Sequence, residues 1–174
     1  TKITSQITKP ISCIIGGSKI STKIEVIKNL IPKFDNIIIV GGMANNFIEY
    51  FGHNIGKSIK EKNCDSIIEE IISLSKKEKC KITYPEDVLV SKDLNGSCKK
   101  KELNEILSDE MILDIGPNTI LKITDIINDM IGLFNRRCAV DCPDNESKFG
   151  IYIFYFKEIT KIISKDERLF FVGL

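Results

Sequence analysis

The sequence predicts an α/β protein: a three-layer α/β/α sandwich built on a mainly parallel sheet, with a small β-hairpin insertion. Three observations support this. Short apolar runs end at glycine pairs, and a helix-like segment follows each of them. These runs are continuously apolar, as expected for parallel strands that are buried on both faces. One later stretch changes to short alternating pieces around Asn95-Gly96, which is typical of a hairpin.

The first strand-like run is ISCII at residues 11–15, and it ends at Gly16-Gly17. Ser21 or Thr22 is a candidate cap for the next helix. The apolar positions of that helix are spaced like one helical face, and Pro32 ends it. These positions are Ile24, Ile27, Leu30 and Ile31.

Residues 36–40 read NIIIV, a second buried strand closed by Gly41-Gly42, and a short helix is expected over 43–51. The segment 65–77 predicts an amphipathic helix that ends in lysines, as the helix dipole favours. A third short strand is expected over 81–84. The alternation of strand, glycine turn and helix makes the sheet parallel and Rossmann-like.

Residues 87–101 predict the hairpin, appended to the sheet. A strand-like turn, MILDIGP, precedes a helix expected over 118–129, where Pro117 suits a helix start. Beyond Ile131 the pattern weakens: 135–150 is polar and turn-rich, 151–156 is β-prone, 157–167 is a candidate helix and 168–174 a final strand.

The stretch GGSKISTK, residues 16–23, raises a choice between a phosphate-binding loop and an ordinary strand-to-helix turn. It matches neither the Walker A loop nor the G-x-G-x-x-G fingerprint. It does follow the carboxyl end of a predicted parallel strand, where open α/β sheets bind ligands. Lys19 and Lys23 are four residues apart and would share a helix face near a positive dipole end, an arrangement that a bound anion would stabilise.

Composition excludes several classes of protein. The net charge is +1, which gives no basic field for nucleic acid, and no apolar run approaches the ~20 residues of a membrane span. Six scattered cysteines are expected to be free thiols in the cytoplasm. Cys138 and Cys142 lack the further ligands that zinc needs, so no metal site is predicted. Because the chain starts at Thr1 and not at Met, we expect a fragment or a processed product.

Four segments carry a family resemblance. GGSKISTKIEVIKNL, IIIVGGMANNFIEYFGHNIGKS, ITYPEDVLVSKDL and MILDIGPNTI occur in that order and at suitable spacings. Together they resemble the carboxy-terminal, nucleotide-binding domain of phosphoglycerate kinase. The resemblance assigns residues 1–130 to that domain and leaves 131–174 as a divergent or truncated continuation of it.

The resemblance implies a glycolytic phosphotransferase that converts 1,3-bisphosphoglycerate and ADP to 3-phosphoglycerate and ATP, with Mg²⁺ held by the nucleotide. Carried over by position, Gly17, Ser18 and Lys19 would line the nucleotide site and Lys23 would meet the phosphates. Gly41 and Gly42 would flank the adenine. Ile112 stands where the family has a glycine beside the base. No catalytic residue is assigned, and a monomer is expected.

The family's W-N-G-P and G-G-G-D-[ST] segments have no equivalent here, and the lobe that would hold 3-phosphoglycerate is missing. The isolated chain is therefore expected to be inactive. A degenerate lobe and a non-catalytic interaction domain remain as alternatives. His53 is interpreted as a surface turn residue in preference to a general base, and Asp87 and Asp114 as capping or turn residues.

Overall fold

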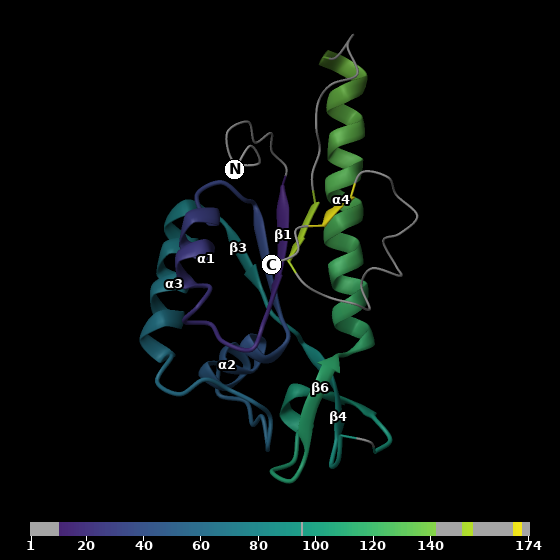
Figure 1. Ribbon diagram of the computed structural model, residues 1–174. Helices are drawn as coiled ribbons and strands as arrows, with labels where there is room; N and C mark the ends of the chain where they lie inside the picture. The colour runs from purple at the N-terminus through teal and green to yellow at the C-terminus, as the bar shows by residue number, and fades with distance from the viewer. Residues whose placement is uncertain (1–10, 95, 142–150, 155–168, 172–174) are drawn as a thin grey trace.

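The computed structural model describes residues 11–94, 96–141, 151–154 and 169–171. The chain forms a parallel sheet with helices on both sides and a smaller antiparallel sheet at one end, as Figure 1 shows. Helices α1 and α3 lie on one side of the parallel sheet and α4 on the other. The predicted α/β/α sandwich with a small hairpin insertion is confirmed.

The parallel sheet has the strand order β3-β2-β1-β7-β8. Its centre is β1 (Ser12–Gly16), which pairs in parallel with β2 (Asn36–Val40) and β7 (Ile151–Phe154). The outer strands are β3 (Lys81–Thr83) and β8 (Leu169–Phe171). All five residues of β1 are buried, which explains its continuously apolar sequence.

Three helices cover the same region of the sheet: α1 (Ile24–Leu30), α2 (Gly42–Tyr50) and α3 (Asp65–Glu78). The main core lies under them. It joins Ile15 and Ile39 of the sheet to Ile27 of α1, Phe47 of α2 and Ile68 of α3, and each of these side chains is at most 1% exposed. The apolar positions whose spacing predicts these helices therefore lie on the helix sides that face the core.

The predicted hairpin is present as β4 (Asp87–Ser91) and β5 (Lys99–Glu102), although Asn95 at its turn lies outside the described residues. The expected position of the hairpin is wrong. It forms a separate three-stranded antiparallel sheet, β5-β4-β6, with β6 (Met111–Ile115), and is not appended to the parallel sheet. A short 3₁₀ turn, η2 (Leu103–Glu105), follows β5. A second apolar cluster, which includes Ile48, Ile55, Val88 and Val90, lies between this sheet and α2.

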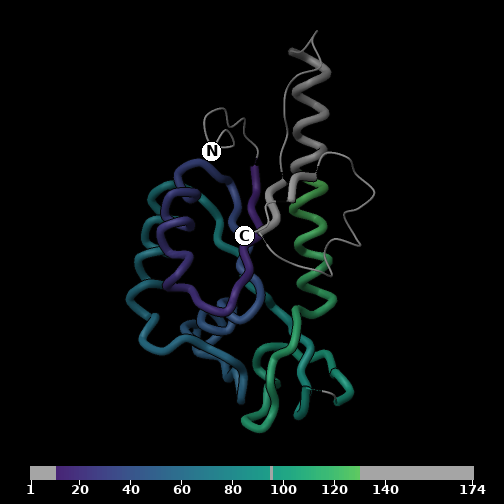
Figure 2. Tube along the Cα trace, viewed as in Figure 1, coloured from purple at the N-terminus to yellow at the C-terminus, as the bar shows by residue number. Residues whose placement is uncertain are grey.

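Helix α4 (Pro117–Asp141) starts at the predicted proline but runs twelve residues past the predicted end at Asp129. The polar, turn-rich interpretation of the segment after Ile131 is therefore wrong as far as Asp141. The Cα trace shows β6 leading directly into α4 (Figure 2). Strands β7 and β8 match the two β-prone segments near the carboxyl end, whereas the candidate helix at 157–167 lies outside the described residues. Within the described part of the chain, no helix combines the length and apolarity needed to cross a membrane.

Candidate functional site

A cavity of about 240 Å³ lies between the start of α2 and the β4–β6 sheet. Gly41, Gly42 and Ala44 border it on the side of β2 and α2, and residues 112–115 of β6 border it on the other side. Most of the remaining lining is apolar. It consists of Asn45, Ile48, Ile59, Pro85 and Val88. The cavity therefore lies beyond the carboxyl end of a parallel strand, the usual place for a ligand in an open α/β sheet.

The two glycine turns after β1 and β2 contact each other at this cavity. Gly41 has φ 70° and ψ −160°, a backbone conformation open essentially only to glycine. A Cβ on Gly42 would lie 3.3 Å from the Cα of Ser18. The Met43 N–H also donates to the Gly17 carbonyl oxygen at 2.8 Å. The glycines thus allow a close approach that brings Gly17 and Ser18 next to the cavity wall.

Ile112 lines the cavity, so the structure brings this predicted site residue together with Gly41 and Gly42. Its side chain is half-buried and packs against the second apolar cluster. Its backbone N–H donates to the Ser58 hydroxyl at 2.8 Å. The branched side chain therefore has structural contacts as well as a place in the cavity wall.

Lys19 and Lys23 do not line the cavity, and their expected arrangement on one helix face is wrong. Lys19 is exposed and precedes α1, whereas Lys23 is half-buried and is itself the N-cap residue. Neither Ser21 nor Thr22 caps α1: the Thr22 hydroxyl donates to the Lys19 carbonyl oxygen at 3.0 Å, and Ser21 contacts Glu61. Among the described residues, neither lysine ammonium group has a hydrogen-bond or ion-pair partner.

A polar loop that was not predicted from the sequence connects these parts. Asn45 and Asn46 of α2 are 4% and 5% exposed and hold residues 59–61 through their side-chain amides. Ile59 lines the cavity, and the Glu61 carboxylate accepts hydrogen bonds from Ser21. Two adjacent asparagines among the apolar residues of α2 were the available signal, because buried amides require partners.

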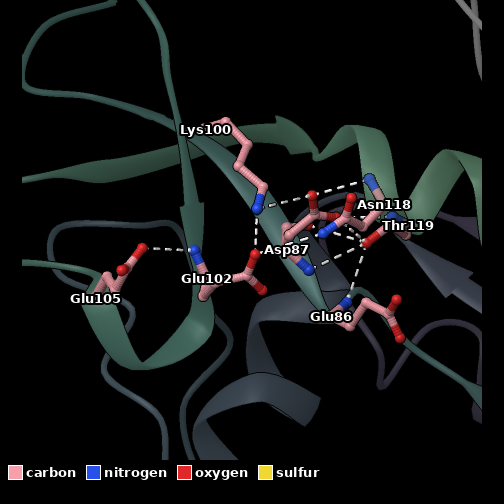
Figure 3. A network of polar contacts seen from close by, with 7 residues as sticks. All are labelled: Glu86, Asp87, Lys100, Glu102, Glu105, Asn118 and Thr119. Atoms are coloured by element: carbon pink, nitrogen blue, oxygen red, sulfur yellow. Dashed lines mark hydrogen bonds and ion pairs between the residues drawn. The ribbon is translucent and has the colours of Figure 1, made fainter.

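Asp87 is confirmed as a capping residue, although its helix lies far along the chain. Its carboxylate is fully buried and accepts the N–H groups of Asn118 at 2.9 Å and Thr119 at 2.7 Å, as Figure 3 shows. The Thr119 hydroxyl donates to the same carboxylate at 2.7 Å. The Lys100 ammonium lies 3.9 Å from Oδ2. Asp87 therefore satisfies the first turn of α4 and fixes the end of β6 beside the cavity.

His53 lies away from the cavity, in a second hollow of about 480 Å³ whose lining includes Lys81, Tyr84, Glu86 and Lys122. Glu86 and Lys122 already form an ion pair at 2.5 Å. Asp114 lies in strand β6, opposite Leu89, and not in a turn; its carboxylate accepts the N–H of Ile115 at 2.8 Å. In the described ranges, no three His, Cys, Asp or Glu side chains are grouped so as to hold a metal ion.

Comparisons with known proteins agree on one family. The family model described as phosphoglycerate kinase matches residues 1–136. The phosphoglycerate kinase of Wolbachia sp. subsp. Drosophila simulans is 41% identical over 171 residues, which cover 92% of this chain and 43% of that protein. That of Novosphingobium aromaticivorans is 39% identical over 122 residues, which cover 68% of this chain and 31% of that protein.

The solved structure of phosphoglycerate kinase from Coxiella burnetii superposes with a TM-score of 0.67 at 25% identity, covering 94% of this chain and 38% of that one. The chain thus spans between about a third and somewhat over two fifths of the length of the relatives it matches. The alignment with the Wolbachia protein covers 92% of this chain. The uncovered remainder is shorter than the segment 131–174, so the similarity extends into that segment.

Proposed function

This chain belongs to the phosphoglycerate kinase family, and on that premise we propose that it supplies the ADP/ATP site of a phosphotransferase acting on 1,3-bisphosphoglycerate and 3-phosphoglycerate. In this proposal it corresponds to the carboxy-terminal, nucleotide-binding half. The other substrate would be held by a part of the protein outside these residues.

The observation that carries the proposal is the cavity beside Gly41, Gly42 and Ile112. Its volume of about 240 Å³ is below the roughly 300–1,000 Å³ of clefts that bury a whole drug-sized ligand. A cavity of this size suits the base of a nucleotide and leaves the ribose and phosphates outside. Its apolar walls, Ile48 and Val88 among them, suit the faces of a planar ring.

In this proposal the turn that follows β1 binds the phosphates of the nucleotide. Gly17 and Ser18 contact Gly42 at the cavity wall, and the Lys19 and Lys23 ammonium groups have no partner among the described residues. Phosphoryl transfer depends on positioning and on neutralising charge, so two unpaired cations on a turn that contacts the cavity wall suit this role. Mg²⁺ would be held by the nucleotide phosphates and would neutralise their charge, since the described side chains offer no carboxylate cluster for it.

One observation favours a second candidate, a degenerate lobe that binds nucleotide weakly or not at all. Ile112 places a branched side chain in the wall where the family has a glycine. A nucleotide-binding lobe and a degenerate lobe predict different changes in ADP affinity when the Ile112 side chain is removed. Ile112 is therefore the position to test.

Ile112→Gly is expected to tighten ADP binding, because it opens the cavity on the side of β6. The same change removes packing from the second apolar cluster, so we expect it to lower the free energy of unfolding by about 1–3 kcal/mol. Calorimetric titration with ADP and with adenosine measures the first effect, and thermal unfolding of the apo protein measures the second.

Leu89→Ala serves as the control, because Leu89 is a half-buried residue of β4 that does not line the cavity. It should lose stability without gaining affinity. If folded Ile112→Gly binds ADP no more tightly than the wild type, the assignment of this cavity to the base is wrong. If neither form binds ADP at millimolar concentration, the degenerate lobe is the correct description.

A further inference from the structure

The turn that carries Lys19 and Lys23 is tied to the wall of the base-sized cavity through Glu61. The Glu61 carboxylate accepts the Ser21 backbone N–H at 3.0 Å with one oxygen and the Ser21 hydroxyl with the other. These bonds from Ser21 lower the pKa of the Glu61 carboxyl below its ordinary value. The carboxylate therefore stays ionised at neutral pH and keeps both contacts.

The other end of this connection is fixed by α2. The Asn46 side-chain amide donates to the Glu61 carbonyl oxygen at 2.6 Å and accepts the Glu61 N–H at 3.2 Å. The Asn45 amide donates to the Ile59 carbonyl oxygen at 2.8 Å. Because Asn45 and Ile59 also line the cavity, the segment 59–61 is part of the cavity wall at one end and the support of the turn at the other.

The turn is also anchored by Ile20, which is fully buried in the main core. The Thr22 hydroxyl and the Lys23 N–H close it locally, onto the carbonyl oxygens of Lys19 and Ile20. Helix α1 has only seven residues and no side-chain cap, so it adds little rigidity of its own. The two bonds from Ser21 to Glu61 thus attach the turn to residues forty positions away.

We propose that Glu61 is a positioning residue: it holds the Lys19–Lys23 turn at the distance from the cavity at which both ammonium groups reach the phosphates of a nucleotide whose base is bound. This inference rests on the proposed function. It adds that affinity for the phosphates depends on a carboxylate that does not touch the ligand.

Two effects of removing Glu61 oppose each other, which makes the experiment decisive. Loss of the Ser21 contacts frees the turn and weakens binding of phosphates, whereas loss of a negative charge near the site would strengthen it. Ser21→Ala removes the hydroxyl contact and leaves the Glu61 charge in place. If position matters most, both substitutions weaken ADP binding, although they change the charge differently.

The measurement is the ratio of ADP affinity to adenosine affinity, obtained by calorimetry on the whole chain. We expect Glu61→Ala to reduce this ratio about three- to tenfold, Ser21→Ala to reduce it by a smaller factor, and Glu61→Gln, which keeps one acceptor, to lie near the wild type. Adenosine affinity should stay within about twofold in all three variants. The control is Glu69→Ala, an exposed α3 residue with no partner among the described residues, which should leave the ratio unchanged.

Outcomes separate this inference from the proposed function. A wild type that binds ADP no better than adenosine overturns both. A wild type with a clear preference for ADP, together with Glu61→Ala and Ser21→Ala ratios equal to it, overturns only the role of Glu61. An increased ratio in Glu61→Ala would also overturn it, because charge and not position would then dominate. If Glu61→Ala does not fold, the Ser21→Ala ratio alone decides between these outcomes.

Discussion

Lys23 is the residue whose interpretation changes most between sequence and structure. It is the N-cap residue of α1, and its side chain makes no cap bond. Its N–H donates to the Ile20 carbonyl oxygen, and its own carbonyl oxygen accepts the first helical bond, from the Ile27 N–H, both at 2.9 Å. The side chain takes no part in these bonds. Its ammonium group is therefore available to an anion without any cost to the turn.

Lys23→Met should weaken ADP binding by about 1.5–3 kcal/mol, the usual contribution of a hydrogen bond to a charged group. The apo protein should be no less stable, because the hydrogen bonds that Lys23 makes in the turn use its main chain and a cation at a helix amino end is unfavourable. Calorimetry and apo melting measure the two quantities.

The matched control is Lys33→Met, since Lys33 is also half-buried but lies after the carboxyl end of α1, away from the cavity. Its ADP affinity should equal that of the wild type. A wild type that binds ADP and a Lys23→Met variant that binds it equally well would remove Lys23 from the phosphate site.

Among the helices, α4 depends on a cap that its own sequence does not contain. Its first turn has no acidic residue, and the residue before Pro117 is a glycine. The carboxylate of Asp87, thirty positions earlier in β4, occupies the cap position instead. Gly116 is required there because a Cβ would lie 2.3 Å from the Asp87 carboxyl carbon. This single carboxylate joins β4 to the start of α4 and lies 3.9 Å from the Lys100 ammonium of β5.

Asp87→Ala is expected to lower the free energy of unfolding by about 3–5 kcal/mol. It leaves the buried Thr119 N–H and the partly buried Asn118 N–H without their acceptor, and each such loss costs about 1–3 kcal/mol before relaxation. The Thr119 hydroxyl loses the carboxylate but keeps the backbone carbonyl oxygen of residue 87 at 3.0 Å. Chemical denaturation monitored by circular dichroism gives the value.

Glu86→Ala is the neighbouring control for this change. Glu86 pairs with Lys122 at the surface, where an ion pair contributes about 0–1 kcal/mol. A loss of stability in Asp87→Ala no larger than that in Glu86→Ala would mean that the buried cap is not needed to hold α4.

At the scale of the whole molecule, this chain aligns with only 31% and 43% of the length of the two relatives described above. Phosphoryl transfer needs both substrates held in line, a contribution of roughly 7–11 kcal/mol in well-oriented systems. The residues described here offer a base-sized cavity and free lysines but no second substrate site that the proposal can assign.

We therefore expect the 174-residue chain alone to make no detectable ATP from 1,3-bisphosphoglycerate and ADP, even under conditions where it binds ADP. A coupled assay of ATP formation tests this, with a complete phosphoglycerate kinase as the positive control. Turnover clearly above the uncatalysed background would contradict the proposed division of labour between two halves.

The sequence alone determined the parallel strands β1, β2 and β3 and the glycine turns after the first two. Continuous apolar runs such as that of β1 identify buried parallel strands, and glycine at Gly41 marks a backbone conformation that other residues do not adopt. These features are local, because periodicity and backbone freedom act over a few neighbouring residues. The four-residue spacing of Lys19 and Lys23 had already identified the two lysines, whereas Ile112 came from the family motifs alone.

Only the tertiary structure decided which residues support the site. The hairpin formed its own sheet with β6, Asp87 capped a helix thirty residues away, and Glu61 held Ser21 across forty residues. Each of these contacts joins polar groups from distant segments, and their partners follow from how the two apolar clusters pack. A sequence pattern shows that a carboxylate is present, whereas the packed core determines which N–H groups come within its reach.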